Sequence, residues 1–468
     1  MRRVRLSAWA TAALLLLGGC ASTPPAPPAA ALNMPTAWLG ASGDAAAVGL
    51  TEAWWRGFGS DELARLLDAA LRHNRELQAT RSRLAQARAL AQVADAARAP
   101  QLEAGFGVAR DRPRGEHADN LWQADLVASY EVDLAGRRRS AVDAASERVR
   151  SGAFALEAAR LSVQAEVAVR YFQVLSLRER IALAQRSLAI AESVLALLQR
   201  QQQAGALSGL EVLRQQTQVV TVRASVPPLE RQLQQTIDVL AVLTGQPPQA
   251  FMLGNARLAA LALPTVAPGL PAALLQRRPD IRQAEAELAA AQADVAAARA
   301  ALMPTLTLTA EGGASSAALG TLLRSGSLAW SVGASVLATI FDGGRRVGVV
   351  AQSTARRDEL VAGYEQVILG ALRDVEDGLA DVARSAEQAA HQQQAIEHAR
   401  AALRMAELRY RHGAVDFSTV LDAQRVLLAA EDAQESVALA RHVAAVGLFR
   451  ALGGGWSGEP ERSAAASR

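Results

Sequence analysis

The sequence predicts a mainly helical protein that carries four membrane-type β-strands and consists of two tandem copies of one unit. Two amphipathic stretches, 136–203 and 345–411, contain no proline, which is typical of very long helices. Four shorter segments alternate apolar and polar residues, which is typical of strands with one apolar face. The third observation is a repeat, because QRRPDIRQAEAELAAAQADVAAARAALMPTL at 276–306 follows the pattern of RHNRELQATRSRLAQARALAQVADAARAPQL at 72–102.

The composition favours long helices packed side by side. The chain has 468 residues, of which 50% are hydrophobic and only 4% aromatic, and it is rich in Ala, Leu, Gln, Arg and Glu. All 49 basic residues are arginines, and they are interleaved with 46 acidic residues along the helical stretches. No basic cluster is combined with stacking aromatic residues, so we expect a solvated helix surface and no nucleic-acid partner.

The first residues indicate an export signal followed by a lipid attachment site. MRRVRLSAWATAALLLLGGC combines early arginines, an apolar run and small residues, so we expect a signal peptide at 1–19. Leu17-Gly18-Gly19-Cys20 resembles a bacterial lipobox, which implies N-palmitoyl and S-diacylglycerol groups on Cys20 and stable anchoring by several acyl chains. Ala21 implies release to the outer membrane. Residues 20–50 form a Pro/Ala-rich tether, and we expect ordered structure to begin near Trp54.

The repeat keeps its register over most of the chain. Pro100 corresponds to Pro304, an offset of 204 residues, and Gly205-Ala206 corresponds to Gly413-Ala414, an offset of 208 residues. We therefore expect an internal tandem duplication with units at 51–250 and 251–456, followed by a disordered tail at 457–468. Each unit has the predicted order helix, two strands, very long helix, turn and returning helix.

The alternating segments have the length of transmembrane β-strands, which need roughly 9–11 residues. We expect these strands at about 101–110, 121–134, 304–312 and 328–341. Trp122 and Tyr130 share the apolar face of the second segment, as aromatic residues at the two sides of an apolar band do. A soluble sandwich is the alternative. Four strands cannot close a barrel and lipid does not tolerate open edges, so a spanning sheet requires several chains to pool their strands.

Each long helix of about 66 residues would extend over roughly 100 Å, which exceeds a globular domain and indicates coiled-coil or helical-barrel packing. It ends at a glycine turn, within QAGALSGLEV or RHGAVDFSTV, and the chain returns as another helix. Pro227-Pro228 lies in the first returning helix. We expect these prolines to break or offset it, because proline lacks the N–H donor and clashes with the preceding turn.

Four motifs carry a family resemblance: WWRGFGSDELARLLDAAL, RRPDIRQAEAELAAAQADVAAARAALMPTLTL, IFDGG at 340–344 and LFRALGGGW at 448–456. They resemble the outer membrane factors of the TolC class, specifically the NodT-like lipoproteins of resistance-nodulation-division efflux systems. The resemblance implies a homotrimer whose strands form one twelve-stranded outer-membrane β-barrel and whose long antiparallel helical hairpins form a periplasmic α-barrel. It also implies outer-membrane lipid, a periplasmic adaptor protein and an inner-membrane resistance-nodulation-division pump as partners.

The implied function is conduction, as an outer-membrane exit duct that passively carries drugs or other small toxic compounds. No residue pattern indicates catalysis, a cofactor or a metal site, and His391 and His398 have the spacing of a solvated helix stripe. An exit duct for type I protein secretion or for metal cations suits the same pattern. A structural coiled-coil lipoprotein would explain the helices and Cys20, but not the duplicated strands.

The resemblance assigns adaptor docking to the two helix–turn–helix tips. These tips are Gly205, Ala206 and Leu207 in the first unit and Gly413, Ala414 and Val415 in the second. Small residues there suit close backbone approach.

The resemblance also predicts a periplasmic gate just beyond the second tip. The family pattern has two pore-facing acidic residues three apart, and alignment on Gly413 puts them at Thr419 and Asp422. Only Asp422 keeps the carboxylate, and Asp416, three residues before Thr419, is the candidate to compensate. Carboxylates gathered near the axis of a pore favour cations over anions.

Overall fold

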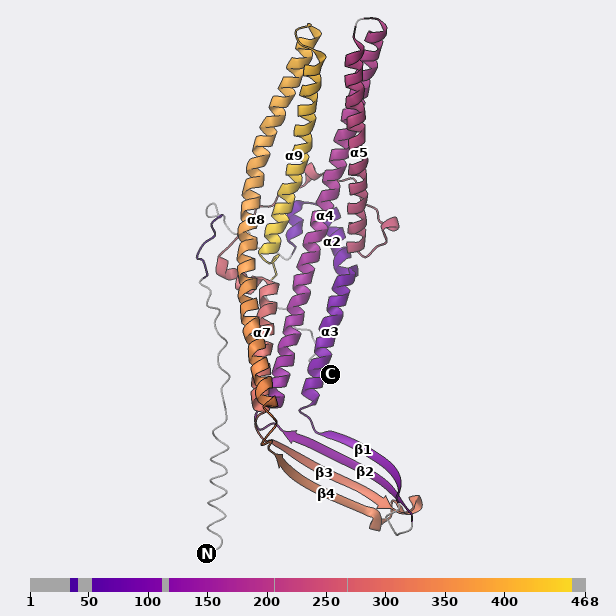
Figure 1. Ribbon diagram of the computed structural model, residues 1–468, viewed down its shortest axis with the longest axis vertical. Helices are drawn as coiled ribbons and strands as arrows, with labels where there is room; N and C mark the ends of the chain where they lie inside the picture. The colour runs from indigo at the N-terminus through magenta and orange to yellow at the C-terminus, as the bar shows by residue number, and fades with distance from the viewer. Residues whose placement is uncertain (1–33, 41–52, 112–117, 206, 267, 457–468) are drawn as a thin grey trace. The chain divides into compact units, whose positions relative to one another are not determined.

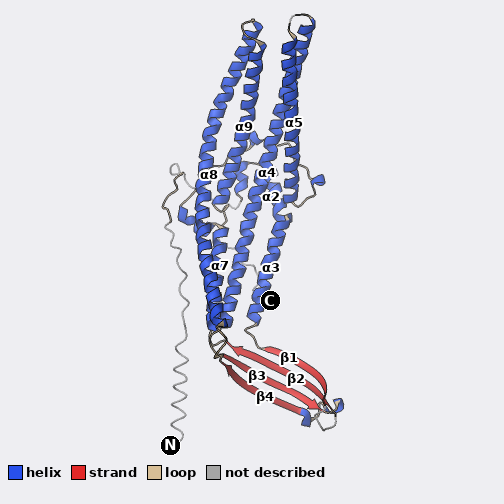
Figure 2. Ribbon diagram, viewed as in Figure 1, coloured by secondary structure: helices blue, strands red, loops and turns tan. Residues whose placement is uncertain are grey.

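The computed structural model describes residues 34–40, 53–111, 118–205, 207–266 and 268–456. The predicted signal peptide, Cys20 and the predicted tail at 457–468 lie outside the described residues. The described chain is mainly helical and contains one antiparallel sheet, as predicted (Figures 1 and 2). Its described residues divide into a strand unit, within 83–153 and 283–366, and a hairpin unit, within 34–82, 154–282 and 367–456.

Both halves of the chain show the order helix, two strands, long helix and shorter helix. The α-helices are α2 (Asp61–His73), α3 (Arg75–Ala96), α4 (Arg137–Gln203), α5 (Gly209–Leu243), α6 (Leu274–Arg277), α7 (Pro279–Ala300), α8 (Arg345–Arg411) and α9 (Phe417–Ala451). The strands are β1 (Gln101–Asp111), β2 (Asp119–Val132), β3 (Thr305–Ser316) and β4 (Leu328–Leu337). The short 3-10 helices are η1 (Trp54–Phe58), η2 (Pro248–Ala250), η3 (Leu258–Ala260), η4 (Pro271–Ala273), η5 (Leu319–Thr321) and η6 (Ser325–Ser327).

The strand unit holds one antiparallel sheet in the order β1-β2-β3-β4. Its register brings the apolar residues of all four strands to one face. One row across the sheet consists of Leu102, Ala128, Ala310 and Val332. Large side chains on this face are exposed within the chain, and Trp330 reaches 81%. The four predicted alternations therefore combine into one continuous apolar surface, because the pleat repeats every two residues in each strand.

The edges of the sheet are β1 and β4. Within the described chain, β1 pairs only with β2, and β4 pairs only with β3. Each of them therefore presents one row of N–H and C=O groups without a strand partner. The bounds differ from the expected ranges mainly in the second half, where β3 continues to Ser316 and β4 ends at Leu337.

An aspartate precedes each of the two long helices, which have 67 residues apiece. Asp133 accepts a hydrogen bond from the backbone N–H of Arg138 over 3.1 Å at the start of α4. Asp342 accepts from the N–H of Gly344 over 3.0 Å and from the N–H of Arg346 over 3.3 Å at the start of α8. The first N–H groups of a helix lack helical partners, and the helix dipole favours an acid there. A side-chain hydrogen bond from Arg346 lowers the pKa of Asp342 further.

The hairpin unit contains two helical hairpins, one of α4 with α5 and one of α8 with α9 (Figure 1). Pro227 and Pro228 lie inside α5, which is one continuous helix, so the predicted break is wrong. A proline in a helix interior costs about 3 kcal/mol. Packing on both sides of the prolines outweighs this cost here, since Val222 and Val226 are buried before them and Leu240 after them.

The main core of the hairpin unit lies where η1 and α2 pack against α4 and the C-terminal ends of α5 and α9. Trp54 stacks on Phe449 with 5.2 Å between ring centroids. The buried hydroxyl of Tyr171 donates to Glu62 over 3.1 Å. Burial, opposed by a hydrogen bond from Ser60, raises the pKa of Tyr171 to about 12. The core therefore joins η1 and α2 to the long helices.

Ordered structure begins earlier than predicted. Trp38 lies within the predicted tether, yet it is only 7% exposed. Its indole Nε1 donates to the carbonyl of Gly269 in the hairpin unit over 2.8 Å. The expectation that order starts near Trp54 is therefore wrong, because a long-range contact fixes a segment whose own Pro/Ala-rich pattern predicts no structure.

Candidate functional site

The two predicted docking tips are the turns within the helical hairpins. Gly205 after α4 has a φ of 74° and Gly413 after α8 has a φ of 70°, which is a left-handed conformation that favours glycine. The N–H of each glycine donates over 2.9 Å to the carbonyl three residues earlier, which closes the last helical turn. Leu207 and Val415 are half-buried and Ala414 is exposed. The predicted tip residue Ala206 lies outside the described residues.

An apolar cluster beneath the turns joins the two hairpins. Its buried residues are Leu198, Val212, Ala406, Phe417, Val420 and Leu421, which come from α4, α5, α8 and α9. The ring of Tyr410 packs on Phe417 with 5.3 Å between centroids. The two tips are therefore held together by packed side chains and form one end of the hairpin unit.

The residues that begin the returning helices differ between the hairpins. Ser208, before α5, donates its hydroxyl to the carboxylate of Glu211, and this hydrogen bond lowers the pKa of Glu211. Asp416 takes the equivalent place before α9, where its carbonyl accepts from the N–H of Thr419 over 3.0 Å and its side chain makes no capping hydrogen bond. Asp416 is thus the N-cap residue of α9. It lies just before the helix and is joined to Thr419 through its backbone carbonyl.

Asp422, the predicted gate carboxylate, takes part in a link between the hairpins. Its side chain is 73% exposed, and its Oδ1 lies 3.7 Å from Nη1 of Arg425, one turn further along α9. Nε of Arg425 donates over 2.8 Å to Oε1 of Gln218, a buried residue of α5. An exposed ion pair of this kind adds roughly 0–1 kcal/mol of stability. The hydrogen bond from Arg425 to Gln218 is therefore the part of this link that joins the two hairpins.

Arg425 and Gln218 are residues that sequence reasoning missed. Asp422 and Arg425 are three residues apart on one helix, and this spacing is a local signal for an ion pair. Gln218 lies 207 residues away from Arg425 on the other hairpin, so no local pattern connects the two. Thr419, the other predicted gate position, is exposed one turn before Asp422.

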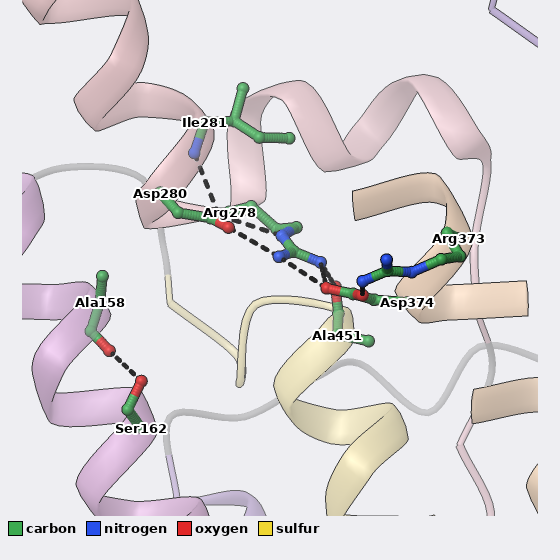
Figure 3. A network of polar contacts seen from close by, with 8 residues as sticks. All are labelled: Ala158, Ser162, Arg278, Asp280, Ile281, Arg373, Asp374 and Ala451. Atoms are coloured by element: carbon green, nitrogen blue, oxygen red, sulfur yellow. Dashed lines mark hydrogen bonds and ion pairs between the residues drawn. The ribbon is translucent and has the colours of Figure 1, made fainter. Parts of the chain in front are cut away.

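A second polar site surrounds Arg278, from the RRPD motif at 277–280 (Figure 3). Its side chain is 11% exposed and donates to Asp280 over 2.6 and 3.0 Å. The guanidinium also donates to Asp374 of α8 over 3.2 and 3.3 Å and to the carbonyl of Ala451 in α9 over 3.2 Å. Burial alone would lower the pKa of Arg278, but the two carboxylates hold it above its ordinary value. One side chain thus connects the start of α7 to α8 and α9.

The same carboxylate of Asp374 has a second, exposed partner. Arg373 donates to it over 2.8 Å, and the Arg373 side chain is 72% exposed. Burial alone would raise the pKa of Asp374, but the hydrogen bonds and charges of Arg373 and Arg278 hold it below its ordinary value. The sequence analysis used RRPD only as a family motif. The local pattern that could have indicated this site is the charged pair Arg278 and Asp280, which lies on either side of Pro279.

His391 and His398 are exposed on α8. In the part of the chain that the structure describes, no three His, Cys, Asp or Glu side chains are grouped so that they could hold a metal ion.

His442 on α9 is buried instead. Its Nδ1 donates to the carbonyl of Ala438 over 2.8 Å, while Nε2 has no hydrogen-bond partner among the described residues. The ring lies between Phe58 and Phe172, at centroid distances of 6.1 and 5.1 Å. Burial lowers the pKa of His442, because protonation would create a second N–H in an apolar site.

Known proteins resemble this chain over nearly its full length. The sequence model of the outer membrane efflux protein family matches residues 66–246 and 270–454. The pyoverdine export outer membrane protein OpmQ of Pseudomonas aeruginosa is 38% identical over 459 residues, which are 96% of each chain. The toluene efflux pump outer membrane protein TtgI of Pseudomonas putida is 35% identical over 458 residues, 95% of this chain and 97% of TtgI. The probable outer membrane lipoprotein SilC of Salmonella typhimurium is 32% identical over 416 residues, 86% of this chain and 88% of SilC.

Solved structures show the same fold. The outer-membrane channel OprN has a TM-score of 0.85 and 29% identity, covering 92% of this chain and 98% of OprN. The open state of the MtrE outer membrane channel of Neisseria gonorrhoeae has a TM-score of 0.84 and 27% identity, covering 92% of this chain and 97% of MtrE. These relatives are channels and not enzymes. The protein therefore belongs to the outer membrane efflux protein family and acts in the outer membrane as the exit duct of an efflux system.

Proposed function

We propose that three copies of this chain form one duct, in which their strands close a twelve-stranded β-barrel and their hairpins form a periplasmic tunnel. The observation that carries this proposal is the sheet, which has an exposed apolar face and two edges, β1 and β4, without partners in the described chain. Lipid offers no hydrogen bonds to open edges, so β4 of one copy must pair with β1 of the next until the sheet closes. The resemblance to trimeric outer membrane factors supports the number three.

Neighbouring residues on opposite faces of β4 give a matched test. Val332 lies on the apolar face and Ser331 on the other. Arginine on the lipid face of a barrel costs about 2–4 kcal/mol at the middle of the membrane. We expect Val332→Arg to lose outer-membrane trimer, while Ser331→Arg inserts and conducts in planar bilayers. Native mass spectrometry of the inserted protein should show three chains. Equal insertion of both variants, or a mass other than that of a trimer, would contradict the proposal.

The two halves of the chain are proposed to be copies of one ancestral unit. Nδ2 of Asn74 donates to the carbonyl of Leu243 over 3.0 Å, and Nη1 of Arg278 donates to the carbonyl of Ala451 over 3.2 Å. The donors are 204 residues apart (278 − 74) and the acceptors 208 apart (451 − 243), which are the two offsets of the sequence repeat. The same type of hydrogen bond occurs at corresponding positions of the two halves, which supports duplication. Each chain would then line the tunnel with two similar hairpins.

A pair of glycines supports the same conclusion. A Cβ on Gly245 would meet the carbonyl oxygen of His73, and a Cβ on Gly453 would meet the carbonyl oxygen of Arg277. Both glycines have positive φ, 74° and 90°. The positions are again related by offsets of 208 and 204 residues. Each glycine allows the end of a returning helix to pack directly on the backbone before the next helix.

The predicted lipid anchor completes the membrane attachment. Cys20 lies outside the described residues, and the lipobox-like sequence before it supports lipidation. The relative SilC, described as a probable lipoprotein, adds to this support. Metabolic labelling with palmitate should mark the wild type and leave Cys20→Ser unlabelled. Incorporation of labelled palmitate into Cys20→Ser would contradict the lipidation of Cys20.

Asp422 is proposed as the gate carboxylate of the periplasmic end, where it lies beside Arg425, which in turn donates to Gln218. Thr419 carries no charge, and Asp416 sits at the cap of α9. Carboxylates gathered near the axis of a trimer favour cations, so Asp422→Ala should lower cation selectivity and weaken block by multivalent cations. Asp377→Ala is the matched control, because Asp377 is 70% exposed and lies 3.8 Å from Arg373 in a similar pair. Unchanged selectivity in Asp422→Ala would refute a gate role.

The hairpin tips are proposed to dock a periplasmic adaptor protein. Positions 205 and 413 both have open space for a side chain, since no atom lies within 4 Å of a Cβ built there. Gly413→Trp should therefore block docking by its bulk and abolish resistance while trimers remain. Gly413→Ala has the same left-handed strain without the bulk and should keep most resistance. Adaptor cross-linking that survives in Gly413→Trp would exclude this tip from the interface.

Cargo choice is proposed to lie with the inner-membrane pump, and the duct to be passive. Relatives of similar length are named for different cargoes, pyoverdine for OpmQ and toluene for TtgI. Drugs and other small toxic compounds fit such a shared duct. The test is to express this chain in strains that lack their own exit duct but keep different pumps. Export should follow the pump that is present, and export of one cargo regardless of the pump would contradict the proposal.

A further inference from the structure

The helices on either side of the sheet strands have matching bounds in the two halves of the chain. α3 spans Arg75–Ala96 and α7 spans Pro279–Ala300, so α7 begins and ends 204 residues after α3. α8 begins and ends 208 residues after α4, and both helices have 67 residues. Each position of α3 or α4 can therefore be matched to one position of α7 or α8.

Contacts between these helices define their order within the strand unit (Figure 1). A Cβ built on Gly152 of α4 would lie 3.3 Å from Cδ1 of Leu84 in α3. α4 also contacts α7, because Oγ of Ser151 donates to Oε1 of Glu287 over 3.1 Å. Nη1 of Arg346, at the start of α8, donates over 2.9 Å to a carbonyl just after α7. The order is therefore α3, α4, α7 and α8, in which α3 and α8 are the outer helices.

The contact between α4 and α7 accompanies the pairing of β2 with β3. Ser151 is buried there, and Arg148 of α4 also donates to the carboxylate of Asp294 in α7. β2 continues into α4 and β3 follows α7, so these neighbouring antiparallel strands bring the two helices side by side. In the same way, β4 continues into α8 and β1 follows α3. Pairing of β4 with β1 of a second copy would therefore bring α8 beside α3 of that copy.

We propose that the contact between α4 and α7 recurs between copies, as a contact of α8 with α3 of the next copy. This inference rests on the proposed trimer and names helix surfaces that meet in it. Ser151 corresponds to Glu359 (151 + 208), and Glu287 corresponds to Arg83 (287 − 204). A carboxylate and a guanidinium thus stand where the chain has a hydroxyl and a carboxylate, so Glu359 binds Arg83 of the next copy. Two different surfaces that meet in this way close a ring.

The two residues proposed to meet are exposed within the single chain. Ser151 is only 7% exposed, whereas the side chain of Glu359 is 65% exposed, and Arg83 is exposed as well. Glu359 forms an ion pair with Arg356, which lies one turn earlier on α8. A carboxylate has two oxygens that accept hydrogen bonds. Glu359 can therefore hold Arg356 and Arg83 of the next copy at the same time.

A second pair of matching positions adds an apolar contact to the same surface. Arg148 and Asp294 correspond to Arg356 (148 + 208) and Leu90 (294 − 204). Leu90 is a large apolar residue, yet it is 66% exposed in the single chain. Arginine can cover apolar surface with its alkyl stem while its charged end stays in a polar environment. In the proposed contact, Arg356 therefore covers Leu90 of the next copy and keeps its guanidinium beside Glu359.

Engineered cysteines test which helix surfaces meet, because Cys20 is the only cysteine of the natural sequence. Purified protein that carries Arg83→Cys and Glu359→Cys is treated with a short bifunctional thiol reagent. We expect linked dimers and trimers on a denaturing gel. Ala85→Cys with Glu359→Cys is the matched control, since Ala85 is exposed but lies about 200° around α3 from Arg83. Linking between copies in this control should be lower by roughly five-fold or more.

The contact within the chain calibrates the reagent. Ser151→Cys with Glu287→Cys should be linked within one chain, because these side chains already touch. Native mass spectrometry of the same samples separates this inference from the proposed duct. A trimer whose positions 83 and 359 stay unlinked, while positions 151 and 287 are linked, overturns the contact and leaves the trimeric duct intact. A protein that is not a trimer overturns both.

Charge reversal tests the ion pair itself. Glu359→Arg would place like charges beside Arg83 of the next copy, so it should lower the temperature at which the trimer dissociates in detergent. Adding Arg83→Glu exchanges the two charges and should restore most of this shift. Asp358→Arg is the control, because Asp358 is 60% exposed and pairs with Arg357 of the same chain. If Arg83→Glu fails to rescue Glu359→Arg, or rescues Asp358→Arg equally well, Glu359 does not bind Arg83 of the next copy.

Discussion

Replacing Arg278 by alanine tests whether the junction of α7, α8 and α9 depends on one buried charge. The change removes the donor that serves Asp280, Asp374 and the carbonyl of Ala451. Removing one partner of a buried ion pair costs about 3–5 kcal/mol, because the remaining charge is left uncompensated. Each kcal/mol lowers the melting temperature of a 150–250-residue domain by about 2–4 °C, so we expect a decrease of roughly 6–20 °C. Circular dichroism of the purified protein during heating measures this decrease.

Arg373→Ala provides the control within the same site. Arg373 holds the same carboxylate of Asp374 but is 72% exposed, so its loss should cost only about 0–1 kcal/mol. Arg278→Met combined with Asp374→Leu removes both charges and should recover part of the loss, as a double-mutant cycle measures. If Arg278→Ala and Arg373→Ala both lower the stability by the same small amount, burial of the charge does not determine the loss of stability.

The same site predicts a dependence on acid. The pKa of Asp374 in the folded protein lies below its ordinary value. A carboxylate of this kind contributes stability above its ordinary pKa, and the contribution is lost as the pH falls through the folded pKa. The melting temperature of the wild type should therefore decrease in acid more steeply than that of Arg278→Met with Asp374→Leu. Parallel curves would show that Asp374 does not carry this dependence.

Two further predictions concern buried groups of the hairpin unit. Because burial lowers the pKa of His442, the unfolded state binds a proton more readily, so stability should fall as the pH drops below about 6.5 and stop falling below the folded pKa. In His442→Phe the melting temperature should depend less on pH in this range. If the dependence is the same as in the wild type, another group is responsible for it. Gly453→Ala should destabilise by about 1–3 kcal/mol, because φ is 90° and the Cβ meets the carbonyl of Arg277. Gly447→Ala, in the interior of α9 with open space, should instead stabilise by about 1 kcal/mol, and the same sign for both would contradict this account.

Patterns with a short period predicted most of the fold. Alternation places successive side chains on opposite faces, so each strand could be found from its own residues, for example from Leu306 and Leu308 in β3. The long helices could be bounded because glycine and the absence of proline are local signals. Gly205 and Gly413 do have the positive φ that a helix–turn–helix tip requires. The docking and gate roles of these tips remain predictions from resemblance.

Features that depend on contacts between distant residues could not be predicted. Nothing in the Pro/Ala-rich segment around Trp38 signals a carbonyl acceptor 231 residues away at Gly269. Gln218 is one of many glutamines on α5, and only the neighbouring hairpin singles it out as the partner of Arg425. The expectation for Pro227 and Pro228 failed for the same reason, since the apolar packing that holds α5 together is not visible in the local sequence.

In the proposed trimer, the sheet edges β1 and β4, which have no second strand partner within the described chain, would make each copy depend on the others for its own folding. A fault in β1 or β4 would then open a seam that an intact neighbour cannot close, because in that trimer the two edges of one copy face two different copies. If the chain assembles as the proposed trimer, roughly one trimer in eight would consist of intact chains only when intact and faulty chains are made in equal amounts. Genetic damage to these edge strands should therefore be dominant, since faulty chains recruit intact ones into barrels that leak or fail to insert. Damage that prevents the chain from being made at all should be recessive.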